Sequence, residues 1–178
     1  GTLNEHCSRT CCSAALHTAG LVRARHPQTR VFEYYRDIRT YGRGQEELYT
    51  EAAGNKVIFF RFEPDSPPTI SANKQGGSPL HVTVKDTLTF GEEVQAPADL
   101  VVLAVGMEPN DVSALVTLMK LPVGSDRFLL EVHPKLRPVE LAVSGILLAG
   151  TCPAPMDVGE ACDAASAAGG TAAALPGR

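Results

Sequence analysis

The sequence of 178 residues contains no tryptophan and no apolar run near the roughly 20 residues that a helix needs to cross a bilayer. It also lacks the basic-then-apolar start of a secretory signal peptide, so we expect a cytoplasmic protein without a membrane span. A formal net charge of only −4 gives no reason to expect binding to nucleic acid or anionic membranes. In a reducing compartment, the five cysteines are expected to be thiols or metal ligands rather than disulfides.

Two common site signatures are incomplete. Structural zinc sites pair two C-x(2–4)-C units, and no second unit follows the first cysteines. The stretch GRGQEE at 42–47 begins like a Gly-rich dinucleotide loop, but Glu47 stands at the third glycine position, which favours a turn capping the next helix. Around this loop, Arg36, Arg39 and Arg43 could contact an anion or form a solvated face.

The remaining composition, 44% hydrophobic and 20% charged, is that of an ordinary globular protein. Apolar periodicity predicts helices over residues 5–25 (capped by Asn4), 45–53, 112–119 and 159–175. Apolar runs predict strands over residues 30–36, 56–63, 98–106 and 144–150, and the run ADLVVLAVG at 98–106 is the strongest of them. Alternating helices and strands predict an α/β fold whose parallel sheet carries an antiparallel β insertion between about Leu80 and Gln95.

Three cysteines, Cys7, Cys11 and Cys12, fall within six positions. On a helix Cys7 and Cys11 would share a face, whereas Cys12 would lie about 100° around the axis. Thiolates select zinc or iron–sulfur clusters, and a [4Fe–4S] cluster takes four of them. Two interpretations stay open: small buried residues on an apolar face, or three cluster ligands whose fourth is Cys152, Cys162 or a residue before Gly1.

The stretch SGILLAGTCPAPMDVGEACDAASAAGG at 144–170 combines a predicted strand, a Gly-bearing turn and a helix of small residues. Small residues let a flat ligand approach the backbone, and the helix start near 158–160 offers free N–H groups. Tight packing of a helix on a sheet would use the same residues. The loop EVHPKLRPV at 131–139 holds three basic side chains between prolines and is a further candidate for lining a site.

Several of these stretches occur together in one known family. In chain order they are CSRTCCSAALHTAGL at 7–21, YYRDIRTYGRGQEELY at 34–49, DLVVLAVGMEPN at 99–110 and FLLEVHPKLRPVELAVSGILLAGTCPAP at 128–155. The sequence resembles the flavin- and iron–sulfur-containing A-subunit family of heterodisulfide reductase and its relatives in sulfur-metabolising bacteria. The resemblance covers nearly the whole chain and is weakest over 64–98. The cysteine segment and HPKLRP are specific, whereas VVLAVGMEPN is shared with many flavoprotein disulfide reductases.

The resemblance implies a partial two-dinucleotide-binding-domain flavoprotein fold of the thioredoxin-reductase type, of which this chain is the later part. Residues 1–105 would form most of the nicotinamide-type domain, and residues 106–178 would be the return segment of the FAD-binding domain. Both ends of the chain are expected to be cut, because Gly1 leads almost directly into a predicted helix and the chain stops at LPGR after an alanine-rich stretch. The resemblance places the Gly-rich FAD fingerprint upstream, which fits a fragment.

The resemblance also implies cofactor sites. Cys7, Cys11 and Cys12 match a C-x3-C-C run that, with another cysteine a short way upstream, ligates a [4Fe–4S] cluster in this family. Gly150, Thr151, Val158 and Gly159 carry over as FAD contacts, although Thr151 stands where many flavoprotein reductases have Asp. The helix start would direct N–H groups at the flavin ring and stabilise its reduced form. No general acid or base is assigned, because the implied reaction is electron transfer.

The implied function is that of an electron-transfer oxidoreductase component, which relays electrons between FAD and [4Fe–4S] centres with the other subunits of a heterodisulfide-reductase-like complex as partners. Taken alone, this fragment is expected to be inactive, to hold neither cofactor well and to self-associate. Two other functions remain open. One is a non-redox α/β binding module with structural cysteines, and the other is a nicotinamide-dependent flavin reductase, which the broken Gly-rich loop disfavours.

Overall fold

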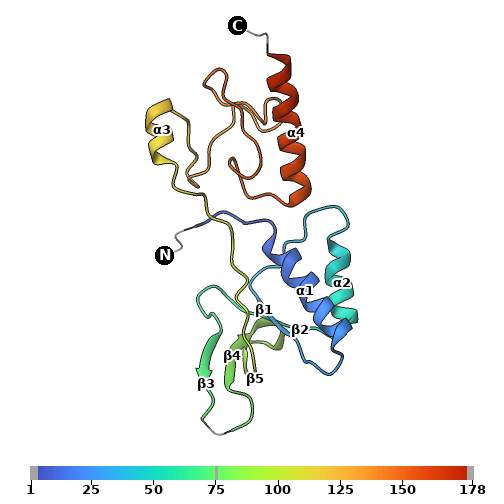
Figure 1. Ribbon diagram of the computed structural model, residues 1–178. Coiled ribbons are helices and arrows are strands. Elements are labelled where there is room, and N and C mark those ends of the chain that lie inside the picture. Colours follow the sequence, from blue (N-terminus) through green and yellow to red (C-terminus); the bar gives the residue numbers. More distant parts are fainter. Residues whose placement is uncertain (1–3, 75, 176–178) are drawn as a thin grey trace. The chain divides into compact units, whose positions relative to one another are not determined.

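The computed structural model in Figure 1 describes residues 4–74 and 76–175. The chain divides into two compact units. One consists of residues 11–105, and the other joins the described residues up to Thr10 to those from Gly106 onward. Among the described residues, no helix has both the length and the apolar character needed to pass through a membrane.

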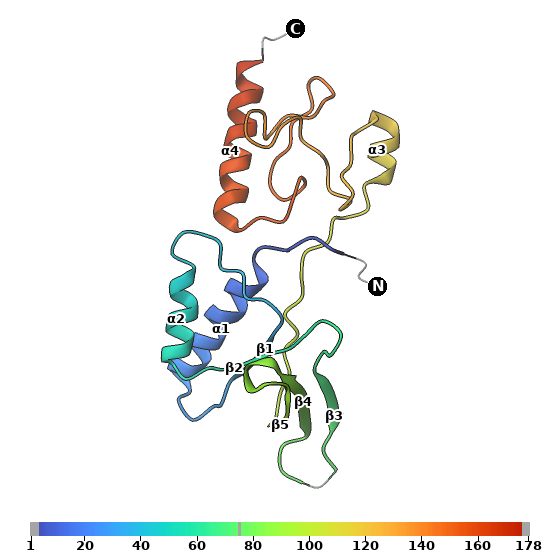
Figure 2. The same cartoon turned by 180° about the vertical axis from the view of Figure 1, so that it is seen from behind.

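The 11–105 unit begins with a helical and parallel layer, seen from two sides in Figures 1 and 2. Its elements are α1 (Cys11–Arg25), β1 (Phe32–Tyr35), α2 (Glu46–Gly54) and β2 (Ile58–Arg61). The two strands run parallel, with Phe32 opposite Ile58. The core consists of Leu16 and Ala19 from α1, Ala52 from α2 and the adjoining Val57, and Phe59 of β2 packs against it. Burial of apolar side chains from both helices therefore holds them on the strand pair.

An antiparallel sheet completes this unit and confirms the predicted insertion. Its strands are β3 (Thr69–Ala72), β4 (Leu80–Asp86) and β5 (Glu92–Ala98), in the order β3-β4-β5. The turn between β4 and β5 contains a short 3₁₀ helix, η1 (Thr87–Thr89), and two left-handed residues, Phe90 and Gly91. Val82 and Val84 are buried two positions apart on β4, as the alternation of a strand requires.

The side chain of Asp86 ties the antiparallel sheet to the parallel pair. Asp86 is only 3% exposed, and its Oδ1 accepts the backbone N–H of Arg61 at 2.9 Å and that of Leu88 at 3.3 Å. A buried carboxylate needs such donors because burial without them is costly. The fold is thus mixed α/β, with a small parallel sheet and a three-stranded antiparallel sheet.

The other unit contains α3 (Ser113–Met119) and α4 (Val158–Ala174), both close to their predicted ranges. Between them the chain forms loops joined by single antiparallel bridges. These loops pack around Leu121, Leu141 and Leu148. The strand predicted over 144–150 is wrong: only one bridge, from Glu140 to Leu147, forms there.

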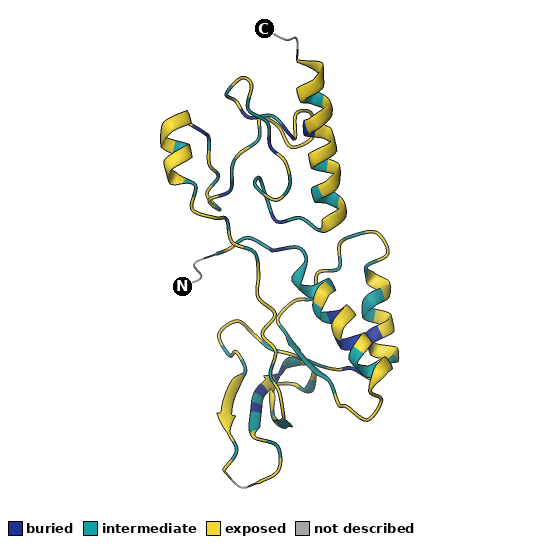
Figure 3. Ribbon diagram, viewed as in Figure 1, coloured by how far each residue is buried: buried dark blue, intermediate teal, exposed yellow. Residues whose placement is uncertain are grey.

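Two other predictions are corrected. The predicted helix over 5–25 begins only at Cys11, and Asn4 does not cap it. Arg9 has φ = +62°, a left-handed conformation that an α-helix does not accommodate. The predicted strand over 98–106 is also absent, since β5 ends at Ala98 and the described residues give the following run no pairing partner. Leu100 and Leu103 are instead 77% and 73% exposed, as the burial colours of Figure 3 show for this segment.

Candidate functional site

The segment before α1 is held in place by residues about a hundred positions later in the chain. Ser8 is buried, and its Oγ accepts the N–H of Met107 at 2.8 Å. A ring nitrogen of His6 lies 2.8 Å from the carbonyl oxygen of Met107, and the His6 ring packs edge-on against Phe128. Asn4 bonds to the side chain of Glu108. These contacts explain why the segment does not join the helix predicted over 5–25.

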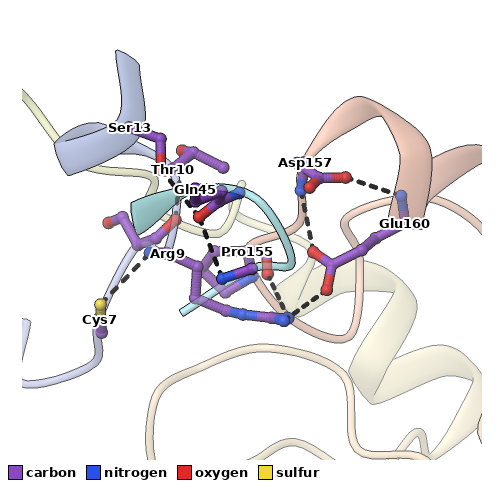
Figure 4. A network of polar contacts seen from close by, with 10 residues as sticks. Cys7, Arg9, Thr10, Ser13, Gln45, Pro155, Asp157 and Glu160 are labelled. Carbon is purple, nitrogen blue, oxygen red and sulfur yellow. Dashed lines mark hydrogen bonds and ion pairs between the residues drawn. The ribbon is translucent and has the colours of Figure 1, made fainter. Parts of the chain in front are cut away.

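Arg9 connects this segment to the beginning of α4, as Figure 4 shows. Its guanidinium donates from Nη1 to the carbonyl oxygen of Pro155 at 3.2 Å and from Nη2 to Oε1 of Glu160 at 2.5 Å. The two charged side chains are 33% and 35% exposed. A charge-assisted contact of this kind is stronger than a hydrogen bond between neutral groups. The Cys7-bearing segment is therefore fixed to the helix start on which the predicted flavin contacts lie.

The first turn of α4 is closed by a capping box. Oδ1 of Asp157 accepts the N–H of Glu160 at 2.8 Å, and Oε2 of Glu160 accepts the N–H of Asp157 at 3.1 Å. The N–H groups of Val158 and Gly159 have no acceptor inside the helix, because the first amides of any helix lack one. Val158 is 82% exposed, and a Cβ on Gly159 would lie 3.3 Å from Oδ1 of Asp157. This helix start can receive an anionic or electron-rich group.

The three clustered cysteines are half-buried. Cys7 lies in the unit that holds α4, and its Sγ accepts the N–H of Arg9 at 3.4 Å. Cys11 and Cys12 open α1 in the other unit, and the Cys12 thiol donates to the carbonyl oxygen of Asp37 at 3.8 Å. Within residues 4–74 and 76–175, no three His, Cys, Asp or Glu side chains form a group that could hold a metal ion. The thiols match a cluster in ligand type, but the described residues do not assemble a complete site for one.

The two later cysteines have different surroundings. Cys152 is half-buried against the Leu121 core, and its thiol donates to the carbonyl oxygen of Ala149 at 3.2 Å. Cys162 is exposed on α4. A cluster ligand must be a deprotonated thiolate. Among the described residues, neither Cys152 nor Cys162 forms a group of possible metal ligands with the clustered cysteines.

A cavity of about 370 Å³ lies beside the predicted flavin turn, in the unit of α4. Thr151 and Cys152 line it together with Arg127 and Phe128. Gly150, just before them, has φ = +67°, a conformation that favours glycine. The cavity falls within the range of about 300–1,000 Å³ usual for small-molecule sites. The structure thus places Thr151 at a cavity, Gly150 in the turn beside it, and Val158 and Gly159 at the start of α4.

The loop after β1, which carries Arg36 and Arg39, forms surface ion pairs with Asp37 together with Arg61 at the end of β2. Guanidinium nitrogens of Arg36, Arg39 and Arg61 lie 3.7, 3.6 and 3.9 Å from the Asp37 carboxylate. A second carboxylate, that of Glu46, lines the same small cavity as Asp37. Exposed pairs of this kind contribute little to stability. The geometry agrees with a solvated loop face.

Two basic side chains of the loop at 131–139, those of His133 and Arg137, make local contacts. Nδ1 of His133 accepts the N–H groups of Lys135 and Leu136 at 3.2 and 3.3 Å. The Arg137 guanidinium donates to Glu140 at 3.1 and 2.5 Å and lowers the pKa of that carboxyl below its ordinary value. These contacts fix the shape of the loop.

Arg9 and Glu160 are the site residues that the sequence prediction missed. The Asp157-x-x-Glu160 spacing is a capping-box pattern and could have identified Glu160. No local pattern indicates the partners of the Arg9 side chain, because Pro155 and Glu160 lie more than 140 positions away.

Comparison with known proteins gives a consistent result. No family model matches the chain. The chain is 39% identical over 171 residues to the second iron–sulfur A-subunit of the CoB–CoM heterodisulfide reductase of Methanopyrus kandleri, covering 96% of this chain and 26% of that protein. It is 39% identical over 155 residues to the corresponding A-subunit of Methanocaldococcus jannaschii, covering 86% and 23%. It is 38% identical over 169 residues to the A-subunit of the H₂:CoB–CoM heterodisulfide,ferredoxin reductase of Methanothermobacter thermautotrophicus, covering 94% and 25%.

The chain spans about a quarter of the length of the curated relatives it matches. The chain is homologous to the A-subunit of heterodisulfide reductase, and it corresponds to about a quarter of that protein.

Proposed function

We propose that this chain is the part of a heterodisulfide-reductase-like A-subunit in which electrons pass between a [4Fe–4S] cluster and FAD. Its partners would be the other subunits of such a complex. The homology to heterodisulfide reductase A-subunits supports this class of reaction. The observation that carries the local assignment is the Arg9 contact, which joins the Cys7 segment to the start of α4.

In this proposal Cys7, Cys11 and Cys12 are thiolate ligands, and the fourth ligand lies outside the described residues. When bound, the cluster would supply one-electron redox chemistry beside the flavin. The N–H groups of Val158 and Gly159 would face the flavin ring and favour negative charge on it. Residues 1–105 and 106–178 would belong to the two dinucleotide-binding-type domains, partial in each case.

Anaerobic reconstitution with iron and sulfide tests the cluster. We expect a version extended upstream to hold four irons per chain, measured by iron analysis and EPR, and the present 178-residue chain to hold fewer. Cys7→Ser, Cys11→Ser and Cys12→Ser should each abolish four-iron binding in the extended version. Cys162→Ser is the matched control, because Cys162 is exposed on α4, and it should leave the iron content unchanged.

An iron content that none of the three substitutions reduces would reject the ligand assignment. It would favour structural cysteines, in line with the lack of a three-ligand group among the described residues. Flavin is tested separately by the absorbance of the purified extended protein. A protein that holds four irons but no flavin would reject only the flavin half of the proposal.

A further inference from the structure

Two carboxylates and one guanidinium meet at the start of α4. Asp157 and Glu160 place two carboxylates within the first turn, where they serve the capping box. The Arg9 guanidinium pairs with Glu160 and comes from a segment 151 positions earlier in the sequence. Together the three side chains carry one net negative charge. Without Arg9 they would carry two, at the end of the helix that offers free N–H groups.

We propose that Arg9 is a positioning residue of the electron-transfer site: it fixes the Cys7 segment to the start of α4 and compensates the Glu160 carboxylate there. The inference rests on the proposed function, because it assumes a cluster bound by Cys7 and a flavin at the start of α4. Arg9 acts in two ways. Its side chain holds Pro155 and Glu160, and its backbone N–H, in a left-handed conformation, donates to Cys7 Sγ.

The electrostatic part has a definite sign. Reduction adds negative charge to a flavin, so an uncompensated carboxylate near it disfavours the reduced form and lowers the midpoint potential. Arg9→Gln should therefore shift the flavin toward the oxidised form. Glu160→Gln should shift it toward the reduced form, since glutamine keeps an oxygen for the Asp157 N–H but removes the charge. We expect a change of about three- to tenfold in the reduced-to-oxidised ratio for each, which is about 15–30 mV for a two-electron couple.

The double variant separates charge from structure. Arg9→Gln with Glu160→Gln restores the wild-type net charge of the three side chains, so its flavin potential should return to within about twofold of wild type in the same ratio. If Arg9 had only a structural role, the potential of the double variant would stay displaced, because that variant still lacks the contact between Arg9 and the start of α4. Arg25→Gln, the same change at an exposed position of α1, is the control and should not move the potential.

The measurement is spectroelectrochemical titration of the flavin-loaded protein purified with its cluster, for wild type and these four variants. Opposite shifts in the single variants and recovery in the double variant support the inference. Unmoved potentials in a protein that holds flavin, or a double variant displaced as far as Arg9→Gln, overturn it and leave the proposed function standing. If Arg9→Gln does not fold, Glu160→Gln decides, because it keeps Arg9 and should still shift the flavin toward the reduced form. A wild-type protein without flavin overturns the proposed function, and the inference with it.

Discussion

Leu16 offers the most direct test of the packing that supports the cysteine helix. It is 1% exposed and is the central side chain of the core between α1 and α2. Leu21 lies on the same helix but is 38% exposed. Substituting alanine at each position makes the same chemical change on one helix, and the two sites differ in burial.

The magnitude follows from the neighbours of Leu16. The substitution removes three carbon atoms from the core, which at about 0.8 kcal/mol each gives about 2.4 kcal/mol before any cavity is counted. Ala19 and Ala52 have no side-chain rotamers with which to fill the space, and Val57 is β-branched and stiff. The cavity should therefore persist, so we expect Leu16→Ala to cost about 3–4 kcal/mol, within the range measured for buried leucines. Leu21→Ala should cost about 1 kcal/mol or less.

Urea unfolding followed by circular dichroism measures both. With a slope of about 1–3 kcal/mol per molar urea, the Leu16→Ala midpoint should fall by at least about 1 M, and that of Leu21→Ala by much less. If the two variants unfold at the same urea concentration, the α1–α2 core described above is not formed in solution, and the position of Cys11 and Cys12 on a packed helix is refuted.

Three further predictions concern single side chains. Asp157→Ala should lower the free energy of unfolding by about 1 kcal/mol in the same assay, because it removes the cap of α4, whereas Asp157→Asn should have little effect. Ser8→Ala should lower the free energy of unfolding by about 1–3 kcal/mol, since it leaves the Met107 N–H without its acceptor. Ser166→Ala, at an exposed position, is the control, and an equal loss in both variants would argue against this contact. Burial raises the pKa of Glu33 above 4.5, so the folded chain binds that proton more tightly than the unfolded chain, and the stability that this confers is lost as pH rises through the folded pKa. Glu33→Gln should accordingly stabilise the chain more at pH 7 than below pH 4.5, and an equal gain at both pH values would contradict a raised pKa.

Patterns among neighbouring residues correctly predicted several helices and strands. The α2 and α4 ranges follow from helical periodicity and end signals, and the β4–β5 pair follows from alternation on both sides of a turn. In each case the residues that decide the structure are neighbours in sequence. The family resemblance likewise rested on short motifs, and the 38–39% identity to heterodisulfide reductase A-subunits confirms it.

Contacts distant in sequence decided the rest. The predicted helix includes residues 5–10, but Ser8 and Arg9 bond to Met107 and Glu160 instead, and the left-handed Arg9 ends any helix there. The apolar run at 98–106 has the composition of a buried strand. A strand requires a neighbour to satisfy its backbone N–H and C=O groups, and the described residues provide none.

The sequence by itself therefore determined the helices α2 and α4, the β4–β5 pair and the family to which the chain is related. Only the tertiary structure decided that the Cys7 segment is fastened to the start of α4 and that Arg9 compensates Glu160. The physical reason is that periodicity and capping act over a few residues, whereas an ion pair between positions 151 apart depends on the path of the whole intervening chain.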